Sequence, residues 1–407
     1  MVTHAGGKKL EEPLVVRPTS ETIINSMFAK WIKSYRDLPM LLNQWANVVR
    51  WEMRTRLFLR TTEFLWQEGH TCHETSAEAQ EETLKMLEVY RDFAENILAM
   101  PVIAGQKTPS EKFAGADSTY CIEAMLQDGK ALQAGTSHNL GQNFARAFET
   151  KFQDRTGQWQ HVFQTSWGVS TRLIGGLIMT HSDDKGLVLP PRVSRYHVVI
   201  VPITFNRGEK TAEKDAKVLE AASNLASLLK SQKVLFEDGS AEDVRVLVDD
   251  DVQHSSGWKF HEYELIGIPI RIEIGPRDLE NNQITFVRRD RDAKSVVNIM
   301  DASKIIPVEL AAMQRALLEK ARAFRRDQSK YCSSYSDFKN SIEDGGFFYV
   351  DWCGSPECEA KIKEETKATI RCVPFDYGDL SDAPESLAGC LYCQAASRQR
   401  VILARAY

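Results

Sequence analysis

Several features that would assign a chain to a class at once are missing from this sequence. No apolar run comes near the roughly 20 residues that a membrane-spanning helix requires, which excludes a helical membrane protein. The opening segment MVTHAGGKKLEEP has no apolar core and does not fit a secretory signal. We find neither an internal repeat nor a low-complexity tract. What remains is the composition of an ordinary globular protein, with 43% hydrophobic and 26% charged residues.

Cysteines are few, and there is no basic excess. Eight cysteines in 407 residues do not suggest a disulfide framework, and we expect a reducing, cytoplasmic setting. The formal net charge of −5 gives no overall sign of nucleic-acid binding, although phosphate contacts need only a local basic face. No GxxxxGK[ST] segment is present, which argues against a Walker-type phosphate cradle. Any phosphate site must then rely on arginines, whose planar guanidinium groups suit phosphate and carboxylate oxygens.

The chain is longer than a usual single domain, and its pattern predicts three regions. Residues 1–193 mix helices with strands, and Thr75 with Glu78 predicts a capping box before a long helix. Residues 194–302 alternate the β-branched runs YHVVIVPI and PIRIEI with helical segments, which suggests a small doubly wound domain. Residues 303–407 begin with a helix whose start we place at Pro307, and they hold six of the eight cysteines.

Four segments follow one another in the first region. They are RPTSE at 17–21, RWE at 50–52, RTTEFLWQEGH at 60–70 and SWGVSTRLIG at 166–175. One five-residue match would mean little, but the ordered set resembles the ATP and amino-acid site of class II aminoacyl-tRNA synthetases, specifically the prolyl-tRNA synthetases. The resemblance covers nearly the whole chain. It implies an α/β protein: an α+β catalytic domain on an antiparallel sheet (1–193), an α/β anticodon-binding domain (194–302) and a small zinc-binding α+β domain (303–407).

Formation of an aminoacyl adenylate brings a carboxylate and a triphosphate into line, so fixed cations matter most. By resemblance, Arg50 bridges the proline carboxylate and the α-phosphate, Arg60 holds the distal phosphates, and Arg172 completes the clamp. Arg50 and Arg172 are the expected catalytic residues. The alternative is that these arginines are surface charges, which fits poorly with the tryptophans and valines around Arg50 and Arg172. The implied ATP site, with Mg²⁺ as the ion that accompanies ATP, consists of Arg50, Glu52, Arg60, Thr61, Phe64, Gln133, Thr136 and Arg172.

Proline is small and apolar and carries a secondary ammonium group. Its site therefore needs hydrogen-bond acceptors at one end and aromatic walls around the ring. By resemblance, Thr19 and Glu21 belong to the loop that accepts from the imino group. His70 and His138 could equally be core histidines, and a lone aromatic residue is more often core than ligand contact. The implied proline site consists of Thr19, Glu21, Arg50, Trp66, His70, Phe113, His138, Trp167 and Gly168.

Two cysteine pairs stand in the third region. Cys353 and Cys358 have C-x4-C spacing, and Cys390 and Cys393 have C-x2-C spacing. Together they fit a tetrahedral four-cysteine zinc site, in which thiolates bind at about 2.3 Å, whereas the alternative is four unrelated thiols. By resemblance the zinc is structural and takes no part in aminoacylation.

The second region contains GWKFHEYELIGIPIRIEIGPRD, which resembles the anticodon-binding domain of the same family and implies tRNA(Pro) as a partner. The basic residues that follow, Arg288, Arg289, Arg291 and Lys294, could contact phosphates. A solvated, charged strand end is an equally good interpretation for any one of them.

Two further expectations concern what the chain does not contain. Many bacterial relatives carry a large editing insertion between the second and third motifs, but Arg60 and Arg172 are only 112 positions apart. The layout thus resembles the eukaryotic and archaeal type, without editing in cis. The first class II motif, which carries most of the dimer interface in the family, is expected to precede the first residue here. We therefore expect the complete protein to be a homodimer.

The leading hypothesis is a proline–tRNA ligase. It would activate L-proline with Mg-ATP to prolyl-adenylate and pyrophosphate, and then transfer the prolyl group to tRNA(Pro). One rival is a non-catalytic synthetase-like module that binds tRNA or protein, against which the intact Glu21, Arg50, Arg60 and Arg172 argue. A second rival is a sister synthetase for threonine or glycine. A threonyl enzyme would be expected to bind a metal in its pocket through Cys and His, and no Cys lies at these positions.

Overall fold

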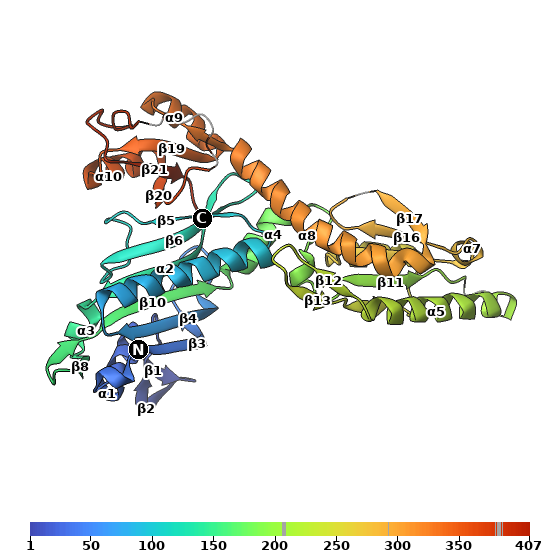
Figure 1. Cartoon of the computed structure of the whole chain (residues 1–407), viewed down its shortest axis with the longest axis horizontal. Coiled ribbons are helices and arrows are strands. Elements are labelled where there is room, and N and C mark those ends of the chain that lie inside the picture. The colour runs from blue at the N-terminus through green and yellow to red at the C-terminus, as the bar shows by residue number, and fades with distance from the viewer. Residues whose placement is uncertain (206–208, 292, 379, 381–383, 385) are drawn as a thin grey trace. The chain divides into compact units, whose positions relative to one another are not determined.

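The computed structural model describes residues 1–205, 209–291, 293–378, 380, 384 and 386–407. These residues form two compact units (Figure 1). The first unit consists of Met1–Phe93, Val102–Gly176 and Phe324–Tyr407, and the second consists of Ala94–Pro101 and Leu177–Ala323. Among the described residues, no helix combines the length and the apolar character that a membrane span requires.

A ten-stranded sheet, in the order β18-β19-β21-β20-β5-β6-β7-β10-β4-β3, forms the centre of the first unit. Every neighbouring pair is antiparallel except β18 and β19. The expected antiparallel sheet of the catalytic region is therefore confirmed, and the third region extends it through β20 and β5. The strands are β3 (Met40–Val49), β4 (Glu63–His73), β5 (Val102–Gln106), β6 (Ser118–Met125), β7 (Ala131–Gly141), β10 (Phe163–Ser170), β18 (Ser329–Tyr331), β19 (Phe347–Trp352), β20 (Thr369–Pro374) and β21 (Gln399–Ala404).

Helix α2 (Ser76–Asp92) covers one face of this sheet. It begins at the predicted capping box, in which the Thr75 hydroxyl accepts from the Glu78 N–H and the Glu78 carboxylate accepts from the Thr75 N–H. Leu87 and Tyr90 of α2 are buried. Because α2 occupies one face of β4, β7 and β10, a ligand site on these strands has to lie on the other face.

Shorter elements surround the sheet of the first unit. A hairpin opens the chain, and α1 follows directly after the RPTSE segment. Helix α4 starts at Arg172 and ends in the second unit. These elements are β1 (Val2–Ala5), β2 (Lys8–Leu14), α1 (Glu21–Trp31), η1 (Tyr35–Asp37), a π-helical turn (Phe93–Ile97), α3 (Asn143–Ala147), β8 (Lys151–Gln153), β9 (Trp159–His161), α4 (Arg172–His181), α9 (Tyr335–Ser341), η5 (Ile342–Asp344) and α10 (Pro356–Thr366).

The second unit contains a five-stranded sheet in the order β14-β11-β15-β16-β17. β14, β11 and β15 are parallel, whereas β16 and β17 add an antiparallel edge. The doubly wound expectation therefore holds for the parallel strands, and the sheet as a whole is mixed. The elements are η3 (Pro191–Val193), β11 (Val198–Pro202), α5 (Glu209–Lys230), β12 (Lys233–Leu235), β13 (Ala241–Asp243), β14 (Val246–Val248), α6 (Ser256–Leu265), β15 (Ile270–Ile274), α7 (Pro276–Glu280), β16 (Gln283–Arg288), β17 (Lys294–Asn298), η4 (Ile299–Asp301) and α8 (Ala302–Asp327).

The expected helix start at Pro307 is wrong. Helix α8 begins at Ala302, so Pro307 lies inside it. Proline lacks the N–H of a helical hydrogen bond, and such a position is usually a break. Here Ala302, Ile306 and Leu310 are fully buried in the core of the second unit, and their burial offsets the lost bond.

Candidate active site

The uncovered face of the central strands forms the floor of a cavity. Cross-strand register places His70 of β4, Ser166 of β10 and His138 of β7 in one row. The next row contains Glu68 and Thr136, with Gly168 between them. Because side chains alternate between the two faces of a strand, the even-numbered residues of β4, β7 and β10 face the cavity together.

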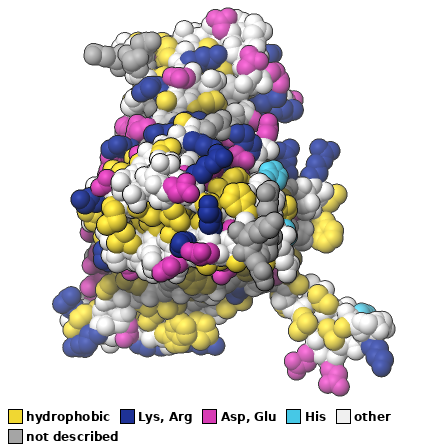
Figure 2. All heavy atoms as spheres, turned by 90° about the vertical axis from the view of Figure 1, so that its right-hand side faces the viewer, with side chains coloured by type: hydrophobic (Ala, Val, Ile, Leu, Met, Phe, Trp, Pro, Cys, Tyr) yellow, Lys and Arg dark blue, Asp and Glu magenta, His cyan; other side chains and the backbone are white. Residues whose placement is uncertain are grey.

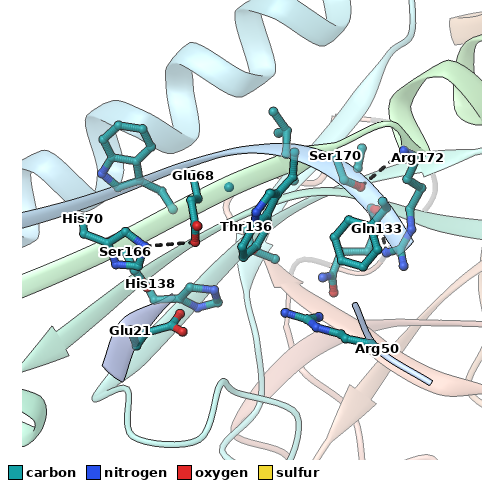
Figure 3. Close-up of a pocket in the computed structure, with 17 residues that line it drawn as sticks. Glu21, Arg50, Glu68, His70, Gln133, Thr136, His138, Ser166, Ser170 and Arg172 are labelled. Atoms are coloured by element: carbon teal, nitrogen blue, oxygen red, sulfur yellow. Dashed lines mark hydrogen bonds and ion pairs between the residues drawn. The ribbon is translucent and has the colours of Figure 1, made fainter. Parts of the chain in front are cut away.

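Figure 3 shows two chemically different ends of this cavity. Carboxylates and imidazoles gather at one end, where Glu21 and Glu68 lie near His70 and His138. Two guanidinium groups, those of Arg50 and Arg172, lie at the other end. The arrangement suits a ligand that is positively charged at one end and negatively charged at the other.

Glu68 is the most strongly held group at the carboxylate end. One of its oxygens lies 3.0 Å from Nε2 of His70, and the other accepts from Nε2 of Gln44 at 2.5 Å and from the Ser20 hydroxyl. Burial alone would raise the pKa of Glu68, but these hydrogen bonds, led by that of His70, hold it below its usual value. The carboxylate is therefore a fixed negative charge on the cavity wall.

His138 is kept neutral in the same place. Burial, followed by the nearby His70, lowers the pKa of His138 to about 4. Its Nδ1 lies 2.9 Å from the Thr119 hydroxyl. At pH 7 His138 therefore offers an uncharged ring to the cavity.

The two arginines at the other end contact neutral groups. The Nε of Arg172 donates to the Leu59 carbonyl at 3.1 Å, and the Nε of Arg50 donates to the Pro18 carbonyl at 2.9 Å. The Arg50 guanidinium also lies over the ring of Phe64, 5.4 Å from its centroid. Burial, then the charge of Arg60, lowers the pKa of Arg172. Among the residues that the structure describes, no carboxylate forms an ion pair with either guanidinium group.

Most of the residues implied by the resemblance line this one cavity. Gly168 leaves floor space open, because a Cβ there would lie 3.2 Å from the Gln67 carbonyl and 3.6 Å from the Trp66 ring. The implied residues at the cavity are Glu21, Arg50, Phe64, Trp66, His70, Gln133, Thr136, His138, Trp167, Gly168 and Arg172.

Trp167 differs from the expected aromatic wall. It stands in register with Gly69 and Ser137, whose face of the sheet is covered by α2. Its ring packs against Tyr90 of α2 at 6.5 Å between centroids. A Cβ on Gly69 would come within 2.0 Å of the Trp167 ring, so the glycine makes room for it. Trp167 therefore borders the cavity along its strand, while its indole supports the floor from behind.

The other implied residues lie around the cavity rather than in its lining. The Thr19 hydroxyl donates to the Glu21 carboxylate, and the Phe113 ring packs 4.8 Å from the His138 ring. Arg60 lies 3.7 Å from the Glu52 carboxylate and donates to a main-chain oxygen of Tyr407 at 3.0 Å. These contacts hold Arg60 at the rim of the cavity. Thr61, the next residue in the chain, lies there too. The last residue of the chain thus lies beside Arg60.

Sequence reasoning missed Glu68. The signal was present, because Glu68 lies two positions from both Trp66 and His70 in FLWQEGH. In a strand this spacing places all three side chains on one face. Ser166 and Ser170 were missed for the same reason.

The four predicted zinc ligands form a cluster beside α10. Their sulfur atoms all lie within 4.8 Å of one another. The sulfur atoms of Cys353 and Cys358 are 3.7 Å apart, and those of Cys353 and Cys393 are 3.8 Å apart. All eight cysteines of the chain are free thiols. Four converging thiols with no disulfide between them match the donor set of a structural Zn²⁺ site.

The basic residues of the second unit divide into two kinds. Arg288 pairs with Asp290 and Glu309, and Arg289 pairs with Asp183. The side chains of both arginines are nearly buried, at 3% and 5% exposed, so they are committed to internal pairs.

All four of these basic residues line a second hollow, but only Arg291 and Lys294 are exposed there. There the Arg271 guanidinium lies over the Phe260 ring, 4.4 Å from its centroid. Figure 2 shows basic, acidic and apolar side chains interspersed on the face it presents, without one continuous basic patch.

Comparison with known protein families divides the chain into three matches. Residues 5–181 match the tRNA synthetase class II core domain (G, H, P, S and T). Residues 197–309 match an anticodon binding domain, and residues 335–407 match the prolyl-tRNA synthetase C-terminal domain.

Individual relatives give the same result. The chain is 56% identical to a Proline--tRNA ligase of Chloroherpeton thalassium over 409 residues, which is 100% of this chain and 81% of the relative. It is 52% identical to Proline--tRNA ligase 2 of Clostridioides difficile, with 100% and 80% covered. A crystal structure of prolyl-tRNA synthetase from Cryptosporidium parvum complexed with L-proline and AMP matches with a TM-score of 0.89 and 38% identity, again covering 100% and 80%. The chain therefore belongs to the prolyl-tRNA synthetases, proline–tRNA ligases of class II.

Proposed function

We propose that the cavity of the first unit is where this ligase activates proline. The separation of charge across the cavity carries the proposal: the carboxylates of Glu21 and Glu68 face the guanidinium groups of Arg50 and Arg172 from opposite ends. The charges of proline are complementary to these ends, because its ammonium group is positive and its carboxylate is negative. Its ring nitrogen would lie at the first end and its carboxylate would point to the second, toward the α-phosphate of ATP.

At the arginine end, the chain's role is to hold anions in line. Arg50 would contact the proline carboxylate and the α-phosphate together, and Arg172 would contact the nucleotide from the far wall. As a carboxylate oxygen of proline attacks the α-phosphorus, pyrophosphate leaves, and cations already in place stabilise the charge that develops. The remaining implied contacts to ATP are those of Phe64, Gln133 and Thr136 in the cavity and of Glu52, Arg60 and Thr61 at its rim.

Mg²⁺ would bind together with ATP. Glu52 offers a carboxylate beside Arg60, and oxygen donors are what Mg²⁺ prefers. The ion would neutralise phosphate charge as the pyrophosphate leaves.

At the carboxylate end, Glu21 and Thr19 would accept from the imino group, and Trp66 would wall the ring. The uncharged His138 fits an apolar substrate better than a charged imidazole would. Phe113 would support His138 from outside the cavity, and His70, Trp167 and Gly168 would complete the floor.

Proline-dependent ATP–pyrophosphate exchange tests this assignment directly. We expect exchange with proline and little with threonine or glycine. An intact, folded protein that supports no exchange would contradict the assignment of the cavity.

We further propose that the four-cysteine cluster binds structural zinc. The convergence of the thiols within 4.8 Å supports this, and a bound metal would add to the folding free energy of a region with a small core. Metal analysis of the purified protein should give about one zinc per chain, and Cys358→Ser should abolish binding. A protein that folds fully without metal would contradict the structural role.

The remaining family properties are proposals of the same kind. The 112-position spacing of Arg60 and Arg172 supports a layout of the eukaryotic and archaeal type without editing in cis, which rapid hydrolysis of alanyl-tRNA(Pro) by this chain would contradict. The three regions 1–193, 194–302 and 303–407 would serve as catalytic, anticodon-binding and zinc-binding domains. The second hollow, with Arg291 and Lys294, supports tRNA(Pro) binding by the anticodon domain.

A homodimer of the complete protein is supported by the edge strand β3. Leu41 and Trp45 of β3 and Leu65 of β4 are 55%, 83% and 63% exposed, which is unusual for large apolar side chains on a sheet. Sedimentation of the complete protein tests this. Synthesis of prolyl-tRNA for translation supports a cytoplasmic location.

A further inference from the structure

The loop of residues 107–117, which joins β5 to β6, supports the carboxylate end of the cavity from outside. It carries Phe113, whose ring packs 4.8 Å from that of His138. The Phe113 N–H donates to the Thr119 hydroxyl at 3.0 Å, and the same hydroxyl lies 2.9 Å from Nδ1 of His138. The position of this loop therefore determines where His138 lies, through a ring contact and through a shared hydroxyl.

The start of the loop is held by a helix from the far end of the chain. The Thr108 hydroxyl donates to the Glu359 carboxylate of α10 at 2.8 Å, across 251 positions of sequence. Both residues are buried, at 1% and 5% exposed. One turn along α10, Lys363 lies 2.8 Å from the Glu111 carboxylate. The buried bond should dominate, because exposed ion pairs contribute little.

Hydrogen bonds inside the loop connect this anchor to Phe113. The Thr108 carbonyl accepts from the N–H groups of Glu111 and Lys112, at 3.1 and 3.0 Å. Phe113 follows immediately. A displacement of Thr108 would therefore move the turn that places the Phe113 ring.

We propose that Glu359 is a positioning residue for proline binding. By holding Thr108, it sets the loop of residues 107–117 and, through Phe113, the His138 ring at the carboxylate end of the cavity. Nothing in this chain of contacts reaches the arginine end, so ATP binding should be insensitive to it. The inference rests on the proposed location of proline in the cavity.

The experiment compares steady-state ATP–pyrophosphate exchange in four single variants of the whole chain and in the double variant of Thr108→Val and Glu359→Ala. Thr108→Val removes the donor with little change of shape, and Glu359→Ala removes the acceptor. Glu359→Gln keeps an oxygen that can accept from Thr108. Lys339→Met is the matched control. It breaks a 3.0 Å ion pair with Glu365, which lies on α10 as Glu359 does, and this pair does not touch the loop.

We expect Thr108→Val and Glu359→Ala each to raise KM for proline about ten-fold, the size expected for losing one hydrogen bond to a charged group. KM for ATP should stay within about two-fold in both. The double variant should be no worse than Glu359→Ala alone, because that variant already removes the bond to Thr108. Glu359→Gln and Lys339→Met should resemble the unmodified protein.

Three results would overturn the proposal. The first is an unchanged KM for proline in both Thr108→Val and Glu359→Ala. The second is an equal rise of KM for proline and ATP together with a lower unfolding temperature, since that pattern indicates general destabilisation. The third is a Glu359→Gln variant that behaves like Glu359→Ala.

A further variant, His138→Ala, separates this inference from the assignment on which it rests. If it raises KM for proline while Thr108→Val does not, only the positioning role of Glu359 fails. If neither variant changes KM for proline, the location of proline itself is wrong.

Discussion

Two pairs of arginines, one pair in each unit, are held in opposite ways. Arg50 and Arg172 of the first unit donate to main-chain carbonyls and, within the described part of the chain, lie in no ion pair shorter than 4.0 Å. Arg288 and Arg289 of the second unit are almost buried and are held by carboxylates. A guanidinium group that is fixed by neutral dipoles keeps its field for a ligand, whereas one that is neutralised by a carboxylate stabilises the fold. The partner, rather than the residue type, indicates the role.

The test of this contrast with the largest expected effect is to remove an arginine of the cavity. Arg172→Ala should lower the rate of proline-dependent exchange about a thousand-fold, because a preorganised charge at the developing phosphate anion is lost. The unfolding temperature should change little. A variant that retains exchange within ten-fold would show that Arg172 is not part of the clamp.

The second unit also buries a basic group that it keeps uncharged. Burial, followed by the charge of Arg245, lowers the pKa of His197 from 6.5 to about 4. The unfolded chain therefore takes up a proton at a higher pH than the folded one. Stability from this group is complete above about pH 6.5 and is lost as the pH falls toward 4, by up to about 3 kcal/mol.

His197→Asn should therefore flatten the acid limb of the stability profile. Urea unfolding of this variant and of the unmodified chain, followed between pH 7 and pH 4.5, measures the difference. Parallel profiles would show that His197 is protonated in the folded protein as well.

Removing an arginine that is paired with a carboxylate should lower stability and leave exchange unchanged, which is the reverse of the Arg172 result. Arg289→Met leaves Asp183, which is 47% exposed, without its partner and should cost about 1–2 kcal/mol of stability. Exchange kinetics should be unchanged, because the pair lies in the second unit and the cavity in the first. A change in KM for ATP or proline would contradict the division of roles.

The smallest expected effect concerns Lys294, an accessible basic residue of the second hollow. Lys294, whose side chain is 57% exposed although it contacts Glu273, should contribute one phosphate contact to tRNA binding. Lys294→Met should raise KM for tRNA(Pro) a few-fold and reduce the salt dependence of binding by about one ion, while exchange stays normal. Identical tRNA kinetics in both proteins would remove this residue from the interface.

The sequence was sufficient to predict the sheet and most of the cavity. RPTSE, RWE and FLWQEGH each carry several site residues in a few positions, and strand alternation places those residues on one face. The four cysteines were predictable from spacing alone, because paired ligands on short loops converge readily.

Other features depend on contacts that no local pattern contains. The sequence around Trp167 would be the same if its ring lined the pocket. Only the position of α2 determines on which face of the sheet the ring lies. Arg60 lies at the rim because Glu52 and the last residue of the chain bind it there. Pro307 violates a local rule that burial of the surrounding helix overrides.

The order of strands in the large sheet has a consequence for synthesis on the ribosome. Its neighbours β20 and β5 are separated by more than 260 positions, and β21 joins only after Gln399–Ala404 has emerged. Only the free edge of β5 must wait for β20, while residues 177–323 can complete their own sheet before the last fifth of the chain exists. A nascent chain stalled before β20 would therefore hold a finished second unit and an open edge at β5, a natural target for chaperones.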